Sequence, residues 1–198
     1  MKLLRNMLVL ALLVCSVATT GLAADRGQMD IAARDALDVF FSNFAETFTR
    51  PFTYNAVSNS ELIKFGVMHV KINRSQMLRD YDAAYWAVAK QEVDNAAYKY
   101  FGKHIVVQSS LEFPLVGDEF LLIKASGEGV RFAQIDSLTD NNDGSYTAFL
   151  QEFVGESTDI HAKVQEPNVA SVAKWRAVIV KAQDGSGRYN LKEYLRLS

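Results

Sequence analysis

Residues 90–108, KQEVDNAAYKYFGKHIVVQ, contain the point at which the hydrophobic spacing of this 198-residue chain changes. Up to residue 101 the apolar side chains recur every three or four residues, and beyond Lys103 they recur every second residue. The first spacing places apolar groups on one face of a helix, and the second places them on one face of a strand. We therefore predict a helix over 90–101, closed by Gly102 in the left-handed conformation, and antiparallel sheet after residue 103.

Two further helices are predicted before this point. A helix over 30–49 begins at the N-cap Asp30 and ends before Pro51. A second helix, over 61–73, follows a run of capping residues at 58–60. Its inward face is predicted to hold Leu62, Phe65, Met68 or His69, and Ile72.

Turn residues divide the second half of the chain into strands. Stretches rich in Gly, Asn and Asp accept positive φ angles and are typical of hairpin turns. The predicted strands cover residues 105–108, 119–124, 130–136, 146–154, 171–181 and 188–197. The predicted fold class is α+β, with three N-terminal helices in 28–103 packed on a curved antiparallel sheet of five to six strands in 104–198.

The last hairpin has two registers that differ in the side chains they pair. A three-residue loop at 185–187 sets Trp175 opposite Leu197, whereas a two-residue loop sets Trp175 opposite Arg196. We predict the first register, because it pairs apolar with apolar. It leaves five cations on the other face: Lys174, Arg176, Arg188, Lys192 and Arg196. This basic stripe is either a site for an anionic partner or a solvated sheet face whose charges prevent edge pairing.

The first 24 residues have the order of a secretory signal peptide. Lys2 and Arg5 precede an apolar run, and small residues end the segment at Ala23 and Ala24. The alternative, a membrane anchor, needs about 20 consecutive apolar residues, and the run is shorter. We therefore predict an exported protein, periplasmic or extracellular, with no stable membrane span after cleavage and a single domain over 25–198.

Composition argues against several classes of function. The formal charge is −2, so the chain lacks the basic surplus of a nucleic-acid-binding protein. The one cysteine, Cys15, lies in the predicted signal peptide, which leaves the exported chain without disulfides. A lipoprotein cut before Cys15 is disfavoured, because Val14 stands where a small residue is expected. The three histidines have no metal-ligand spacing, and we predict no metal and no cofactor.

Two local patterns have both a functional and a structural interpretation. Residues 140–145, DNNDGS, resemble a calcium loop, but Leu150 stands where that loop needs a bidentate acid. A hairpin turn explains the same residues, and we favour it. In the helical half the candidate ligand-binding residues are His69, Tyr85 and Trp86. A histidine near an apolar helix face is also typical of a buried structural residue.

Packing and turn residues give the chain a resemblance to a group of bacterial proteins. The residues that carry it are Phe65, 100–102 (YFG), 108–109 (QS), 132–134 (FAQ), 143–147 (DGSYT), 188–189 (RY) and Tyr194. In these residues the chain resembles a group of uncharacterised exported proteins and lipoproteins of bacteria, which has no established activity to transfer. In fold, the order of helices and strands is similar to nuclear-transport-factor-2-like and cystatin-like domains, whose helices cover a curved sheet and often enclose a pocket.

These observations favour a non-catalytic exported domain that binds an envelope protein, an envelope polymer or an apolar small molecule. Binding would use the sheet face or a pocket beneath the helices. The alternative is a small-pocket isomerase or dehydratase of the nuclear-transport-factor-2-like type, which requires a carboxylate or histidine buried in a cavity.

Overall fold

The structure is a computed structural model that describes residues 23–25, 29–125, 130–155 and 169–198. Its helices are α1 (Ile31–Glu46), α2 (Asn59–Asn73) and α3 (Lys90–Phe101), with a short 3-10 helix at Ser75–Met77. The large sheet has the order β1 (Ala23–Asp25), β6 (Val130–Asp140), β7 (Ser145–Gly155), β8 (Ala170–Lys181) and β9 (Tyr189–Arg196). The small sheet has the order β2 (Arg79–Asp80), β3 (Tyr85–Ala89), β5 (Glu119–Ile123) and β4 (Leu115–Val116).

The predicted α+β class, with three helices and an antiparallel sheet of five strands, is confirmed. The predicted signal peptide lies outside the described residues, except for Ala23 and Ala24 at the start of β1. Its cleavage therefore stays a prediction.

The helix boundaries follow from capping groups that the sequence supplies. The Asp30 carboxylate accepts a hydrogen bond from a backbone N–H in the first turn of α1 (3.2 Å), and Ser58 caps α2 in the same way. Gly102 ends α3 at φ 65°, the left-handed conformation predicted for it. Helix α1 ends a few residues before the predicted boundary, because Phe48 adopts the left-handed conformation (φ 53°) and the Thr49 N–H donates back to the Phe44 carbonyl (3.0 Å).

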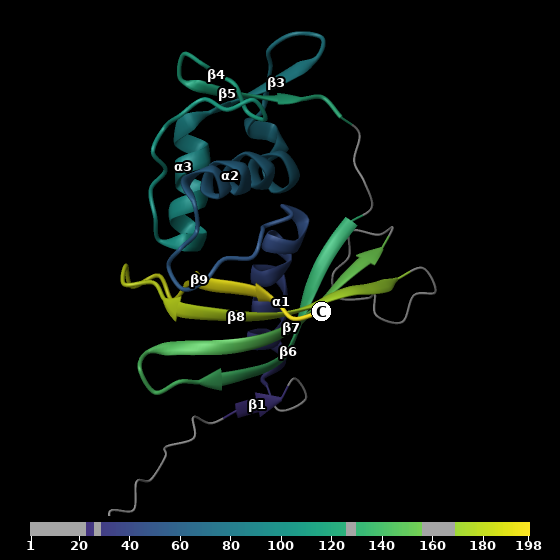
Figure 1. Ribbon diagram of the computed structural model, residues 1–198, viewed down its shortest axis with the longest axis vertical. Helices are drawn as coiled ribbons and strands as arrows, with labels where there is room; N and C mark the ends of the chain where they lie inside the picture. The colour runs from purple at the N-terminus through teal and green to yellow at the C-terminus, as the bar shows by residue number, and fades with distance from the viewer. Residues whose placement is uncertain (1–22, 26–28, 126–129, 156–168) are drawn as a thin grey trace, which may run out of the picture.

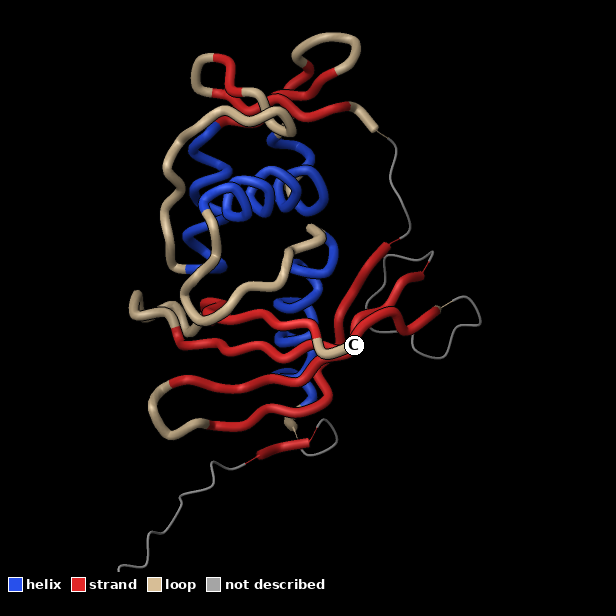
Figure 2. The backbone as a smooth tube through the Cα atoms, viewed as in Figure 1, coloured by secondary structure: helices blue, strands red, loops and turns tan. Residues whose placement is uncertain are grey.

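Figure 1 shows the small sheet at the far end of α2 and α3 from the large sheet. The hydrophobic spacing of the sequence does not predict this second sheet. Segment 119–124 contains a strand, as predicted, but that strand is β5 and pairs with β3, which precedes α3. The predicted strand at 105–108 is wrong, because this stretch is irregular chain (Figure 2). A side chain at the start of α2 takes the hydrogen bonds that a neighbouring strand would make. The Val106 N–H donates to the Asn59 side chain (2.6 Å), and the Asn59 amide donates to the Val106 carbonyl (2.7 Å).

Helices α2 and α3 lie between the two sheets (Figure 1). As a result α2 is buried on two sides: Leu62 and Phe65 join the cluster on the large sheet, whereas Val67 and Val70 join the cluster on the small one. Ile72, which the spacing places inward, is 42% exposed. The interior is thus divided into two hydrophobic clusters by these helices.

Helix α1 packs along β6 of the large sheet. The Ser42 hydroxyl donates to the Ala133 carbonyl (3.2 Å) and accepts from the Ala133 N–H (3.0 Å). One turn earlier, the Asp38 carboxylate accepts from the Ile135 N–H (2.7 Å). These residues of β6 lie outside the part that pairs with β1. Side chains of α1 therefore form the hydrogen bonds that a neighbouring strand would otherwise form with the backbone of β6 at this edge.

The hairpin of β8 and β9 differs from its predicted register. Trp175 lies opposite Arg196, and a β-bulge shifts the pairing in the middle of the hairpin. The predicted three-residue loop is part of a longer turn, closed by a hydrogen bond from the Ala182 N–H to the Arg188 carbonyl (2.8 Å). With the observed register Tyr194 faces inward, where its ring stacks on Trp175 with centroids 4.2 Å apart.

Candidate functional site

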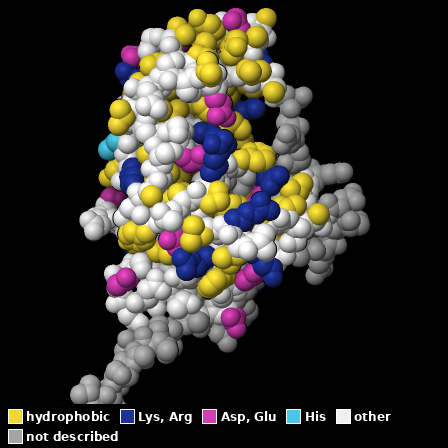
Figure 3. Space-filling model, viewed as in Figure 1, with side chains coloured by type: hydrophobic (Ala, Val, Ile, Leu, Met, Phe, Trp, Pro, Cys, Tyr) yellow, Lys and Arg dark blue, Asp and Glu magenta, His cyan; other side chains and the backbone are white. Residues whose placement is uncertain are grey.

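The cations of the predicted basic stripe do not form one surface. Lys174 and Arg176 alternate with the buried Trp175 and so lie on the outer face of β8. The Arg176 guanidinium is paired with Glu193 (2.5 Å), which leaves little of its charge for a partner. Figure 3 shows Lys and Arg side chains near the middle of one face, with hydrophobic side chains between them.

The other cations of the stripe lie on the helix side or at the hairpin turn. The Lys192 ammonium donates to the Phe101 carbonyl at the end of α3 (3.3 Å). Arg188 lines hollows beside α3, and Arg196 lines a different hollow at the end of α1. The predicted single stripe is therefore wrong, because it assumes a regular hairpin, whereas the bulge and the long turn redirect the side chains of β9.

Tyr85 and Trp86 are not brought together with His69. Both belong to β3 of the small sheet, where Tyr85 lies opposite Ile123 and Trp86 opposite Leu122. Trp86 packs against the cluster of the small sheet, whereas His69 lies beside Phe65 in the large-sheet cluster. A shared site for the three residues is not formed.

His69 is buried and hydrogen-bonded. Its ring stacks on Phe65 with centroids 5.6 Å apart, and the side-chain amide of Asn73 lies 3.3 Å from Nδ1. Burial, and then the positive charges of Lys99 and Arg74, lower the pKa of His69 from 6.5 to about 4. The imidazole is therefore neutral at neutral pH.

Residues 140–145 form the hairpin turn between β6 and β7. Asn142 and Gly144 have φ angles of 60° and 84°. The Asp140 carboxylate accepts from the Asn142 N–H (2.8 Å), and Asp143 accepts from the Ser145 N–H (2.9 Å). The turn interpretation is confirmed. Over the described residues no three His, Cys, Asp or Glu side chains are grouped in a way that suits a metal ion.

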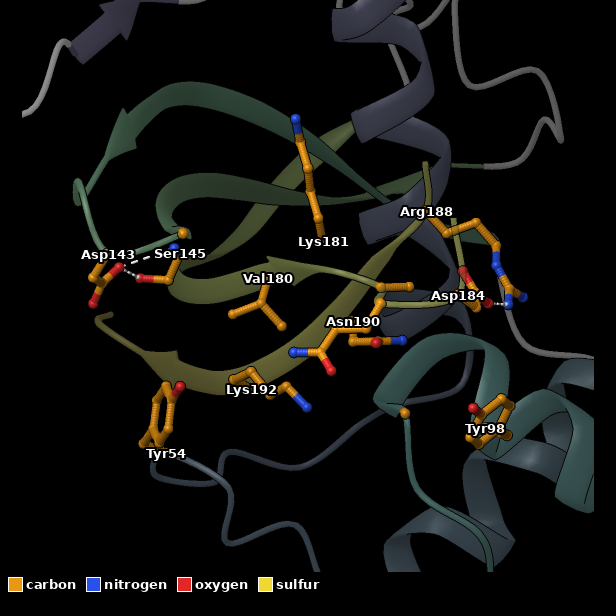
Figure 4. Close-up of a pocket in the computed structure, with 14 residues that line it drawn as sticks. Tyr54, Tyr98, Asp143, Ser145, Val180, Lys181, Asp184, Arg188, Asn190 and Lys192 are labelled. Atoms are coloured by element: carbon orange, nitrogen blue, oxygen red, sulfur yellow. Dashed lines mark hydrogen bonds and ion pairs between the residues drawn. The ribbon is translucent and has the colours of Figure 1, made fainter. Parts of the chain in front are cut away.

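A polar groove of about 650 Å³ lies between this turn, the end of α3 and the hairpin of β8 and β9 (Figure 4). Asp143 and Ser145 lie at one end of it, and Asp184 and Arg188 lie at the other. The Ser145 hydroxyl donates to Asp143 (2.5 Å), which keeps the pKa of that carboxyl below its usual range, and Arg188 is paired with Asp184. Lys192, which donates to a carbonyl of α3, and Lys181, which lies over the Tyr146 ring at 6.0 Å, also line this groove and form no ion pair with a described residue.

An apolar groove of about 460 Å³ lies between α1, α3 and the start of β9. Its apolar walls include Leu37, Val39, Phe40, Tyr100, Leu138 and Tyr189. Phe40 stacks on Tyr100 with centroids 5.9 Å apart and meets Tyr189 edge to face at 6.4 Å. These rings give the groove an aromatic floor.

Cations stand at one edge of the apolar groove. A neighbouring hollow of about 390 Å³, the histidine cavity, shares Lys99 and Arg188 with the groove. His69 and Arg74 also line this cavity. The apolar groove therefore opens on one side to a region with three positive charges.

Lys99 differs from its two cationic neighbours. Arg188 is paired with Asp184, and Arg74 is paired with Glu92 (2.6 Å). No acidic side chain in the described part of the chain forms an ion pair with Lys99. Its pKa is lowered, first by partial burial and then by the positive charges of Arg188 and Arg74. Lys99 is thus a cation without a counter-charge at the edge of an apolar groove.

Sequence reasoning named His69 and Arg188 but missed Lys99 and the aromatic floor. A signal for the floor exists in α1, where Leu37, Phe40, Phe41 and Phe44 form a wider apolar stripe than one sheet face covers. The structure buries the other three and leaves Phe40 partly exposed. No comparable signal marks Lys99, one lysine among 21 basic residues.

No helix within the described ranges is long and apolar enough to cross a membrane. The resemblance to exported bacterial proteins stays a prediction. Comparison of the chain with protein-family models, with curated proteins and with solved structures found no match.

Proposed function

We propose that the protein is a non-catalytic binding domain of the bacterial cell envelope whose ligand is an amphipathic small molecule with an anionic end group. The observation that carries the proposal is Lys99, unpaired among the described residues, at the junction of the apolar groove and the histidine cavity. The apolar body of such a ligand would gain about 25 cal/mol for each Å² that it removes from water. Its anionic group would supply the counter-charge that Lys99 lacks.

The envelope location rests on the predicted signal peptide and on the resemblance to exported proteins. The choice of a small amphipathic ligand over a polymer rests on the contrast between the grooves. The walls of the polar groove are mostly polar, with Arg188 paired to Asp184 and Asp143 bonded to the Ser145 hydroxyl. The apolar groove combines apolar walls with few polar groups, the usual composition of small-molecule sites.

The isomerase alternative has less support. It needs a carboxylate and a hydrogen-bond donor that converge in one cavity. His69 lines a cavity, but its hydrogen-bond partner is Asn73, and Glu46 is reached only through the Asn73 amide, which donates to it (3.2 Å). With a pKa of about 4, the His69 imidazole is also a weak base.

A matched series of dodecyl amphiphiles tests the proposal. Dodecanoate, dodecanol and dodecyltrimethylammonium share the apolar chain and differ in charge. We expect dodecanoate to bind most tightly and the cation most weakly, as measured by isothermal titration calorimetry below the micelle concentrations. Lys99→Met should weaken dodecanoate binding about fivefold, which corresponds to an exposed ion pair of about 1 kcal/mol.

Two further variants control this test. Lys90→Met changes a lysine of the same helix that is paired with Asp118 (2.5 Å) away from the groove, and it should leave dodecanoate affinity unchanged. Val39→Glu places a negative charge at a groove position that is 42% exposed, and it should abolish binding without unfolding the protein. Equal affinity for the three amphiphiles, or binding that survives Val39→Glu, would contradict the proposal.

A further inference from the structure

The polar groove, the histidine cavity and the apolar groove adjoin one another around the C-terminal half of α3. The polar groove and the histidine cavity share Tyr98 and Arg188, and the histidine cavity and the apolar groove share Lys99 and Arg188. Arg188 therefore lines all three hollows. The path from the apolar groove to the polar groove passes Lys99, Arg188 and Tyr98.

The geometry of α3 accounts for the order of the three hollows. Successive residues of an α-helix are about 100° apart around its axis, so Tyr98, Lys99 and Tyr100 point in three directions. Tyr98 lines the polar groove, Tyr100 lines the apolar groove, and Lys99 stands between them at the histidine cavity. Gly102, four residues after Tyr98, lies on the same face as Tyr98 and also lines the polar groove.

The side chains along this path are accessible to a ligand. Tyr98 is 42% exposed, Lys99 is exposed and Arg188 is partly exposed. The Tyr98 ring is nevertheless held in place, because it stacks on His104 with centroids 4.5 Å apart, and Nδ1 of His104 lies 2.8 Å from the Asp94 carboxylate. An exposed ring with a fixed orientation loses little conformational entropy when a ligand packs on it.

The polar groove suits an uncharged polar group better than a second anion. Its lining charges nearly cancel, with two acids and three cations: Asp143, Asp184, Lys181, Arg188 and Lys192. A sugar hydroxyl both donates and accepts hydrogen bonds, so it can bond to acids and cations alike. Figure 4 shows Tyr98 at the same end of the groove as Arg188 and Asp184. A sugar that enters from the histidine cavity therefore meets Tyr98 first.

We propose that the ligand of the apolar groove is an anionic glycolipid, with its apolar chain in that groove, its anionic group beside Lys99 and Arg188, and its sugar in the polar groove against Tyr98. Lys99 forms no ion pair with a described residue, and the negative face of an aromatic ring attracts the C–H groups of a sugar. The polar groove, with about 650 Å³, has room for a sugar. This inference rests on the proposed function and adds the class of the head group.

Three dodecyl compounds separate the contributions of the charge and the sugar. Dodecyl glucosyl phosphate and dodecyl methyl phosphate are phosphodiesters of equal charge that differ in the sugar, and dodecyl glucoside has the sugar without the charge. Isothermal titration calorimetry below the micelle concentrations should give dodecyl glucosyl phosphate at least about fivefold higher affinity than either of the others. If the glucosyl group adds no affinity, the inference is overturned, while the proposed function still stands on the binding of dodecanoate. If neither dodecanoate nor the phosphodiesters bind, both fall.

Two variants should act on different parts of the glycolipid. Tyr98→Ala should remove most of the gain from the glucosyl group, so that the two phosphodiesters bind about equally. Lys99→Met should weaken both by the same factor, about fivefold, because both carry the charge. Tyr81→Ala changes a tyrosine of similar exposure (41%) between β2 and β3 of the small sheet, and it should change neither affinity. A loss by the same factor for both phosphodiesters in Tyr98→Ala would overturn the inference.

Discussion

Helix α1 has the apolar groove along its N-terminal half and a second hollow at its C-terminal end, the arginine hollow, which is lined by Arg50, Arg131 and Arg196. The groove and the hollow differ in where their charges lie. In the apolar groove the walls are apolar, and Lys99 and Arg188 stand at the edge. In the arginine hollow a buried carboxylate, Glu152, forms part of the wall and is paired with Arg131. A buried charge that loses its partner destabilises the fold, whereas an exposed charge contributes little. Removal of a charged group should therefore cost little stability in the groove and much more in the hollow, where Glu152 is buried.

The largest expected contrast is between two phenylalanines one turn apart on α1. Phe40 and Phe44 contact each other, with ring centroids 5.1 Å apart, but Phe44 is fully buried against Phe65 and Phe101. Phe44→Ala should lower the free energy of unfolding by about 4 kcal/mol, as for other buried aromatic residues. Phe40→Ala, on the partly exposed groove floor, should lower it by about 1.5 kcal/mol.

Urea denaturation measures both losses, provided that the two variants have the same dependence on urea concentration. Phe40→Ala should also weaken dodecanoate binding. Equal losses of stability would show that the groove is as closely packed as the interior, and the proposed amphiphile site would then lack its cavity.

The next contrast compares a charged residue of the arginine hollow, Glu152, with a charged residue of the apolar groove, Lys99. Glu152→Leu removes the partner of Arg131 and the acceptor of the Trp175 indole, and we expect a loss of about 3 kcal/mol in unfolding free energy. Lys99→Met, which breaks no ion pair with a described residue, should change stability by less than about 0.5 kcal/mol. The double variant Glu152→Leu with Arg131→Met should recover part of the loss, because it removes the unpaired guanidinium but leaves the buried Trp175 indole N–H without its acceptor. No recovery in the double variant would contradict this account.

The helices were within reach of sequence reasoning because their signals are local. Asp30, Ser58 and Gly102 lie next to the helices that they cap, and the structure uses each of them as predicted. The division into two sheets was out of reach, because β5 pairs with β3 across the whole of α3. Alternation shows that 119–124 is a strand, but it does not show which strand lies beside it.

The candidate sites were harder to predict for the same reason. Arg188 and Arg196 were found by alternation in the last strand, but their environments depend on a bulge that no pattern revealed. Lys99 becomes notable only when Arg74 and Arg188, distant in sequence, come to lie beside it.

The smallest expected effect is a change of folding stability with pH that comes from His69 in the histidine cavity. His69 faces Lys99 and Arg74, its hydrogen-bond partner Asn73, and the ring of Tyr100. Its pKa is about 4 in the folded protein and about 6.5 in the unfolded chain. Between these values the unfolded chain binds a proton that the folded protein does not bind, so folding stability falls as pH falls.

At about pH 7.5 the imidazole is neutral in both states. At about pH 5, His69 should therefore lower the free energy of unfolding by roughly 2 kcal/mol relative to that pH. The measurement is the change in unfolding free energy between these two pH values, compared with the change in His69→Gln. The subtraction removes the titration of other groups, Glu46 among them, whose pKa burial raises. The variant should lose less stability on acidification than the unsubstituted protein. Equal losses would mean that the folded protein binds the proton of His69 as readily as the unfolded chain does, which would contradict the lowered pKa of the buried imidazole.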